Sequence, residues 1–225
     1  GHLENHLRDK SHGRIYRITH KDSKNSQSLD LRNAGDDELI NALSHENMFW
    51  RMMAQKKLVQ GKKYDAIPLL IDLAKSKNLD GIGSDPAVIH ALWTLHGLGQ
   101  LNGLNKEANS VAEKALNHPS AMVRKNAVRV LPKTNRSAKL LAKMLSEKNT
   151  NALRHILLTL SVMPENNELG KVIYSLKENI NGMKALQAPY NLALIRHGSS
   201  LAEKLIAGGP LRNKNNEDEI KPIES

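Results

Sequence analysis

The side chains best suited to chemistry in this sequence are its ten histidines, two pairs of which have suggestive spacings. His2 and His6 lie four residues apart, a spacing that lets two imidazoles share a metal ion on one helix face. No third ligand is close to them, and the surrounding sequence has no helical pattern. His90 and His96 lie six residues apart, about 240° around a helix, so they cannot meet at one site. We therefore expect partly buried packing histidines and no metal site.

Carboxylates gather at two places, and neither pattern predicts catalysis. The segment Asp80–Asp85 contains two glycines but lacks the alternating ligands and the closing Glu of a calcium-binding EF-hand loop. No strand precedes it, so it does not match a phosphate-binding loop either. Asp36–Glu38 is an acidic run at an expected helix start, where the helix dipole explains it. Cysteine is absent, which excludes disulfides, thiolate sites and covalent haem attachment within these residues. We predict no catalytic, metal or cofactor residue in the chain.

One short pattern recurs along the sequence. An Asn or Pro at a turn is followed, four or five positions later, by an Arg or His, and then by small and apolar residues at helical spacing. The pairs are Asn47 with Arg51, Pro86 with His90, Pro119 with Arg124, and Asn149 with Arg154. Successive copies lie roughly 30 to 40 residues apart, the period of stacked helical pairs.

These copies predict an all-α fold. The chain is 40% hydrophobic but has only seven aromatic residues besides histidine, one Phe, two Trp and four Tyr, so aliphatic side chains must fill the core. Amphipathic stripes predict about five helical pairs. We expect helices from 36 and over 47–60, 64–76, 85–98, 105–117, 120–131, 136–146, 150–163, 167–179 and 183–197. Stacked pairs of this kind form an α–α superhelix of the HEAT or armadillo type.

The two ends of the chain differ from this pattern. Arg14–Thr19 alternates polar and apolar residues, as a single β-strand does, and a polar segment follows it. We expect residues 1–28 to be the end of an upstream domain with a linker, 29–207 to be the solenoid, and 208–225 to be a polar tail. A chain that begins with Gly1 is expected to be a piece of a longer protein.

The repeated basic position has two possible roles. In such repeats an Arg commonly reaches an acidic or carbonyl acceptor in the neighbouring repeat, and we assign this ladder role to Arg51, Arg124 and Arg154. The surface lined by the second helix of each pair is the expected binding face. Its candidate recognition side chains are Trp50, Arg51, His90 and Trp93, each with a core or ladder role as the alternative.

The net charge of +10 permits an anionic partner, although dispersed charge mainly favours solubility. One candidate anion surface is a group of basic residues that could form a ridge on the third and fourth pairs. It comprises Arg124, Lys125, Arg129, Lys133, Arg136, Lys139 and Lys143. This stretch has no aromatic side chains for stacking on bases, which disfavours single-stranded nucleic acid.

Three segments, Arg8–Ile18, Asn47–Leu58 and His90–Leu98, carry a family resemblance. They resemble large bacterial membrane-bound dehydrogenase-like proteins with a haem-binding carboxyl-terminal module. In that family a propeller similar to quinone-dependent sugar dehydrogenases ends at a Gly-Arg-Ile-Tyr-Arg strand, which Gly13–Arg17 matches here. A HEAT-repeat segment follows, and often a cytochrome c domain. The resemblance covers residues 8 to about 100, and beyond them only the general repeat pattern continues.

The resemblance implies a periplasmic or cell-surface parent oxidoreductase acting on sugars or alcohols, with quinone and haem c as its cofactors. This chain would be its non-catalytic scaffold, with other domains of the same polypeptide or a protein partner bound to it. No Cys-x-x-Cys-His motif occurs here, so no haem site can be transferred to this chain. Two alternatives stay open: a basic HEAT-like nucleic-acid-binding protein, and a protein-docking module unrelated to redox chemistry.

Overall fold

The computed structural model describes residues 11, 13, 18, 21–22 and 27–199, and these residues contain helices and turns but no strand. The predicted strand at 14–19 lies outside the described residues apart from Ile18. The predicted polar tail from 208 also lies outside them. The all-α prediction is confirmed.

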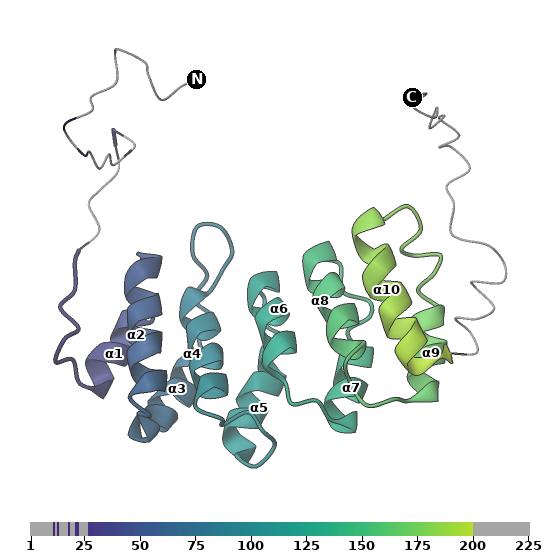
Figure 1. The fold of residues 1–225 in the computed structure, drawn as a ribbon, viewed down its shortest axis with the longest axis horizontal. Helices are drawn as coiled ribbons and strands as arrows, with labels where there is room; N and C mark the ends of the chain where they lie inside the picture. Colours follow the sequence, from purple (N-terminus) through teal and green to yellow (C-terminus); the bar gives the residue numbers. More distant parts are fainter. Residues whose placement is uncertain (1–10, 12, 14–17, 19–20, 23–26, 200–225) are drawn as a thin grey trace.

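The described chain contains ten α-helices in five consecutive pairs, as predicted (Figure 1). The first helices of the pairs are α1 (Asp36–Ala42), α3 (Ile67–Leu73), α5 (Lys106–Ala115), α7 (Asn135–Ala142) and α9 (Asn167–Tyr174). The second helices are α2 (Met48–Gln60), α4 (Pro86–Gly97), α6 (Ala121–Val130), α8 (Thr150–Leu160) and α10 (Lys184–His197). A 3₁₀ turn, η2 (Tyr64–Ala66), leads into α3.

Local sequence explains where most second helices begin. The side chains of Asn47 and Asn149 accept hydrogen bonds from the first backbone N–H groups of α2 and α8. Asp85 does the same for α4, where Pro86 occupies the first helical position. These residues satisfy N–H groups that have no partner inside the helix, and proline loses nothing there. The turn residues of the recurring pattern are therefore helix caps or their immediate neighbours.

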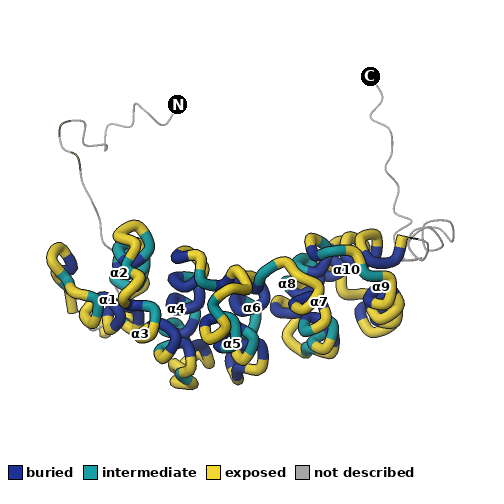
Figure 2. Tube along the Cα trace, turned by 90° about the horizontal axis from the view of Figure 1, so that it is seen from below, coloured by how far each residue is buried: buried dark blue, intermediate teal, exposed yellow. Residues whose placement is uncertain are grey.

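The helices form two layers that stack along the array. Consecutive second helices pack closely against one another from α2 through α4, α6 and α8 to α10, and we call this row the second-helix layer. Consecutive first helices touch less extensively. Figure 2 shows that the row of helices is bowed.

The core runs between the layers through all five pairs as one continuous cluster. Each second helix places a fully buried residue seven positions after its capping residue, and these residues vary widely in size. They are Ala54, Leu92, Ala127, Ile156 and Tyr190. A single pair could not bury such a stripe alone, so stacking of neighbours is what stabilises the fold. No helix in the described part of the chain is long and apolar enough to cross a membrane.

Candidate functional site

Arg124 forms the predicted link between adjacent repeats. Its Nη1 donates to the carbonyl oxygens of His118 and Pro119, at 2.8 and 2.9 Å, in the turn before its own helix. Its Nε and Nη2 donate to the two carboxylate oxygens of Glu147, at 2.7 and 2.9 Å, in the turn before α8. This bidentate pair lowers the pKa of Glu147. One guanidinium thus fastens the turn of the third pair to the turn of the fourth.

Arg51 occupies the equivalent place in α2 but makes only half of these contacts. Its Nη1 donates to the carbonyl oxygens of His45 and Glu46, at 2.6 and 2.7 Å. Its Nε is buried and has no hydrogen-bond partner among the described residues. Burial lowers the pKa of Arg51, an effect that nearby Asp80 partly opposes. No described residue binds the edge of Arg51 that corresponds to the edge holding Glu147 in the third pair, so the contact with the neighbouring repeat predicted for Arg51 is not observed.

Arg154 does not follow this arrangement. Arg51 and Arg124 lie four residues after their capping residues, Asn47 and Ser120, whereas Arg154 lies five after Asn149. One residue turns a side chain by about 100° around a helix. Arg154 therefore points in a different direction from Arg124, and in the structure it is exposed and forms no hydrogen bond or ion pair with any described residue. The single recurring basic position in the sequence is two positions in the structure, and the ladder role assigned to Arg154 is wrong.

His90 also lies five residues after its capping residue, and it is buried rather than exposed for recognition. Its Nδ1 lies 2.7 Å from Oε1 of Gln55, on the neighbouring helix α2. Burial, together with the charge of Arg51, lowers the pKa of His90 to about 4. His90 is therefore a neutral packing residue that joins α4 to α2, whereas His96 is exposed.

The two tryptophans are half-buried. Trp93 donates from Nε1 to Oδ1 of Asn126, at 2.8 Å, which ties α4 to α6. The guanidinium of Arg129 lies 5.0 Å from the centre of the Trp93 ring, in cation–π contact. Trp50 packs edge to face with the exposed Phe49 near the start of α2, with ring centres 4.9 Å apart.

The predicted basic ridge is divided between two layers and partly neutralised. Arg124 is paired with Glu147, and Arg136 forms a bidentate pair with Glu113. Lys133, Lys139 and Lys143 are exposed on α7 or in the turns at its ends. Arg124, Lys125 and Arg129 lie on α6, which belongs to the second-helix layer, whereas α7 does not. Because Arg124 is paired with Glu147, Lys125 and Arg129 are the members of the ridge on this layer that have no carboxylate partner among the described residues.

Lys125 and Arg129 join Arg154 of α8 in a group that we call the basic cluster. All three charges act on His155, whose pKa is lowered first by burial and then by Arg129, Lys125 and Arg154. No ion pair joins these three side chains to a carboxylate within the described residues. Sequence reasoning missed this cluster, because Arg154 and the α6 residues come from different repeats and meet only when the repeats stack.

A second recurring position was missed in the sequence. It lies two residues before several capping residues, and its side chain accepts a hydrogen bond from the backbone N–H of the capping residue. Nδ1 of His45 and Nδ1 of His118 accept hydrogen bonds from the backbone N–H of Asn47 and Ser120. Glu147 does the same for Asn149 through Oε1. Matching the helices by their capping residues would have revealed this shared position, and Gly83 is its counterpart before Asp85.

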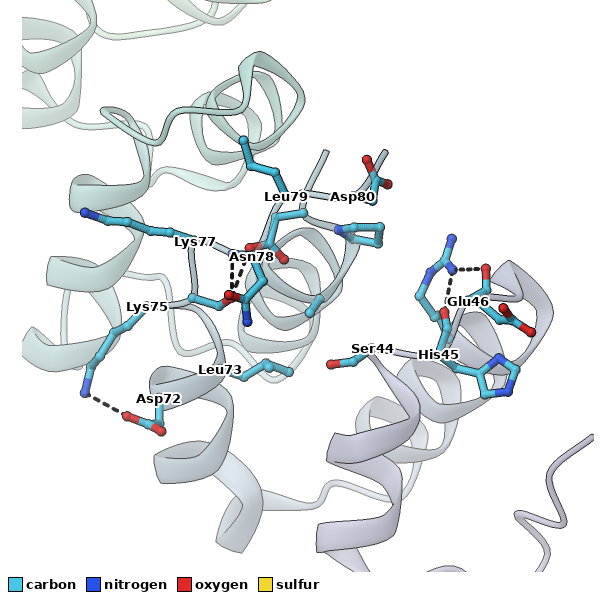
Figure 3. Close-up of a pocket in the computed structure, with 15 residues that line it drawn as sticks. Ser44, His45, Glu46, Asp72, Leu73, Lys75, Lys77, Asn78, Leu79 and Asp80 are labelled. Atoms are coloured by element: carbon cyan, nitrogen blue, oxygen red, sulfur yellow. Dashed lines mark hydrogen bonds and ion pairs between the residues drawn. The ribbon is translucent and has the colours of Figure 1, made fainter. Parts of the chain in front are cut away.

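A cavity of about 790 Å³ opens beside Arg51, between the first and second pairs. It is lined by the turn Ser44–Glu46, the end of α3, the long connection to α4 and the first residues of α4 (Figure 3). Asp72 and Lys75 face each other as an ion pair at its rim. Within the described residues, no three His, Asp or Glu side chains are grouped so that they could hold a metal ion.

No protein-family model matches the chain, and neither does any protein of curated function. The fold is similar to a chain in the solved complex of CpcE and CpcF of phycocyanin lyase from Nostoc sp. PCC7120. The match has a TM-score of 0.54 and 17% sequence identity, and it covers 83% of this chain and 77% of the other. At this identity the likeness concerns the fold, an all-helical HEAT-like solenoid.

Proposed function

We propose that the chain is a protein-interaction scaffold that uses its second-helix layer to bind an acidic surface of another protein or domain. The observation that carries the proposal is the basic cluster. Lys125, Arg129 and Arg154 project from two adjacent second helices without a carboxylate partner among the described residues. Other prominent cations of the ridge, such as Arg124 and Arg136, are already neutralised within the fold.

The surroundings of the cluster favour a protein as the partner. Arg129 lies over Trp93, and Met122 is exposed on the same helix as Lys125. Near the start of α2 the same layer exposes Phe49 and Met52. Aromatic residues, Met and Arg are the types enriched in protein interfaces. A nucleic-acid duplex would use the charges but would leave these apolar side chains without a role.

The wider setting rests on the sequence resemblance. According to this resemblance, the partner is a neighbouring domain of a periplasmic or cell-surface oxidoreductase, and the quinone and haem c of that oxidoreductase lie outside this chain. The similar solved structure is a complex of two proteins, so one known member of this fold binds another protein. That parallel supports a scaffold role and does not bear on redox chemistry.

The test uses the full chain and the domains that flank it in the parent reading frame. Binding would be measured by interferometry for the wild type and for a Lys125→Glu, Arg129→Glu, Arg154→Glu variant. The control reverses three exposed lysines of the first helices, Lys106, Lys114 and Lys139, and so has the same net charge. We expect at least about tenfold weaker binding for the cluster variant only.

The alternative function, binding of nucleic acid, is tested by titrating a labelled DNA duplex at several salt concentrations. Tighter binding of the duplex than of the flanking domains, with a steep salt dependence that the cluster variant reduces, would favour the nucleic-acid function instead. Equal effects of the cluster and control variants would refute the proposed binding face.

A further inference from the structure

The guanidinium of Arg51 lies at the cavity and offers two donors, Nε and Nη2, for which the described chain supplies no acceptor. Nη1 of Arg51 is held by the two turn carbonyls, which fix the plane of the guanidinium. Nε is buried without a hydrogen-bond partner. A buried donor that has lost its water and gained no acceptor is costly, so a small shift of the groups packed over Nε is favoured if it lets an acceptor from the cavity reach this atom.

Arg124 shows which acceptor fits this geometry. With Nη1 held by the equivalent carbonyls, its Nε and Nη2 bind the carboxylate of Glu147. Glu147 lies two residues before the capping residue of the next second helix. At the equivalent position before α4 the chain has Gly83, which has no side chain to offer. The connection that contains Gly83, residues 74–85, is longer than residues 143–149 of the fourth pair, and it lines the cavity.

We propose that this cavity binds a carboxylate group supplied from outside the described fold, with Nε and Nη2 of Arg51 as its bidentate donors. A guanidinium fork matches the two oxygens of a carboxylate. Leu73, Leu79 and Pro86 also line the cavity, so the carboxylate can be carried on a short apolar stem. An acidic side chain of a polypeptide and a small carboxylic acid both have this chemistry. The inference does not depend on the function proposed for the basic cluster.

The acidic residues of the cavity restrict the charge of the ligand. The Asp85 carboxylate is buried and accepts hydrogen bonds from Ser76 Oγ and from the Val88 N–H. Oδ1 of Asp80 accepts hydrogen bonds from two backbone N–H groups of its own loop, and Asp80 forms no ion pair with Arg51. Their negative charges repel a dianion more strongly than a monoanion, because Coulomb energy scales with the ligand charge. A monoanionic carboxylate is therefore preferred to phosphate.

The experiment follows the arginine Nε–H resonances of the full chain by ¹H–¹⁵N NMR, assigned with Arg51→Lys and Arg124→Lys variants. We expect sodium acetate, but not sodium chloride at equal ionic strength, to shift the Arg51 resonance saturably. The Arg124 resonance serves as the internal control and should not respond, because Glu147 occupies its edge. In a Glu147→Ala variant the Arg124 resonance should begin to respond. Arg51→Lys should weaken acetate binding, followed on neighbouring backbone amides, by about tenfold or more because the fork is lost.

Further probes separate the sources of the carboxylate. A capped Ala-Glu-Ala peptide that binds at least ten times more tightly than acetate, while its Gln analogue does not bind, supports a polypeptide ligand. Equal affinities of the peptide and acetate support a small acid.

Three results would overturn the proposal: no saturable shift with acetate, equal binding of inorganic phosphate, or a response only in an Asp80→Asn variant. The last result would mean that the carboxylate of Asp80 itself pairs with Arg51 in solution and blocks the site.

Discussion

Replacing Glu147 with Gln should destabilise the solenoid far more than replacing Glu113 with Gln. The two carboxylates form ion pairs of nearly identical geometry, each bidentate to an Arg 23 residues away, with bonds of 2.7–2.9 Å and 2.8 Å. They differ in burial. The side chains of Arg124 and Glu147 are 20% and 7% exposed, whereas Arg136 is 76% exposed. The chain thus contains its own control for the effect of burial on a salt bridge.

The expected magnitude follows from what the amide cannot replace. Gln keeps one acceptor oxygen, so Arg124 loses one charge-assisted bond and its Nε or Nη2 faces an NH₂ group. Losing such a bond and leaving a buried charge unpaired costs about 2–4 kcal/mol. At the Arg136 pair, water replaces the lost partner, and we expect a change within the error of the measurement.

Urea unfolding, followed by circular dichroism at neutral pH, measures both variants. The dependence of the unfolding free energy on urea concentration must be the same in the variants as in the wild type for the comparison to hold, since a solenoid can unfold in parts. Equal losses for Glu147→Gln and Glu113→Gln would refute the reasoning that burial decides the strength of these pairs.

Acid provides a second check on the same pair. The bond to Arg124 lowers the pKa of Glu147 in the folded chain below its usual 4.5. The pair therefore contributes stability above pH 4.5 that is lost as the pH falls through the folded-state pKa. The difference between the wild type and Glu147→Gln should shrink over that range, and a difference that persists in acid would contradict this assignment.

Three further outcomes are expected. The pKa of His90 is lowered to about 4, so between pH 6.5 and 4 the wild type should lose on the order of 3 kcal/mol more than His90→Asn, as urea unfolding of both proteins across this range will show. Gly170→Ala should lower the melting temperature sharply because its Cβ would overlap the backbone at the end of α10, whereas a Cβ on Gly81 meets nothing within 4 Å and Gly81→Ala is the control. Trp93→Phe should cost about 1–3 kcal/mol in urea unfolding, because it leaves the buried Asn126 oxygen without its donor; an unchanged midpoint would show that water replaces the indole.

The amino-acid sequence determined the secondary structure and the class of fold. Caps such as Asn47 and Asn149, and Pro86 at the first position of α4, act on backbone groups within a few residues. Apolar periodicity is equally local, so helix positions and their pairing could be predicted without knowing what each helix packs against. The predicted helix over 150–163, for example, is observed at Thr150–Leu160.

Only the tertiary structure decided which basic residues are available for binding. Arg124 and Arg154 have the same residue type and nearly the same place in the recurring pattern, yet one is neutralised by Glu147 and the other is exposed. Arg51 has the contacts of Arg124 without its carboxylate, because Gly83 stands where the next repeat would supply one. The physical reason is that these outcomes depend on the angle around a helix, on burial and on a partner from another repeat. The angle follows from the number of residues after the cap, which could be counted only once the caps were known. Burial and the partner are set when the repeats stack, and a linear pattern of residue types contains neither.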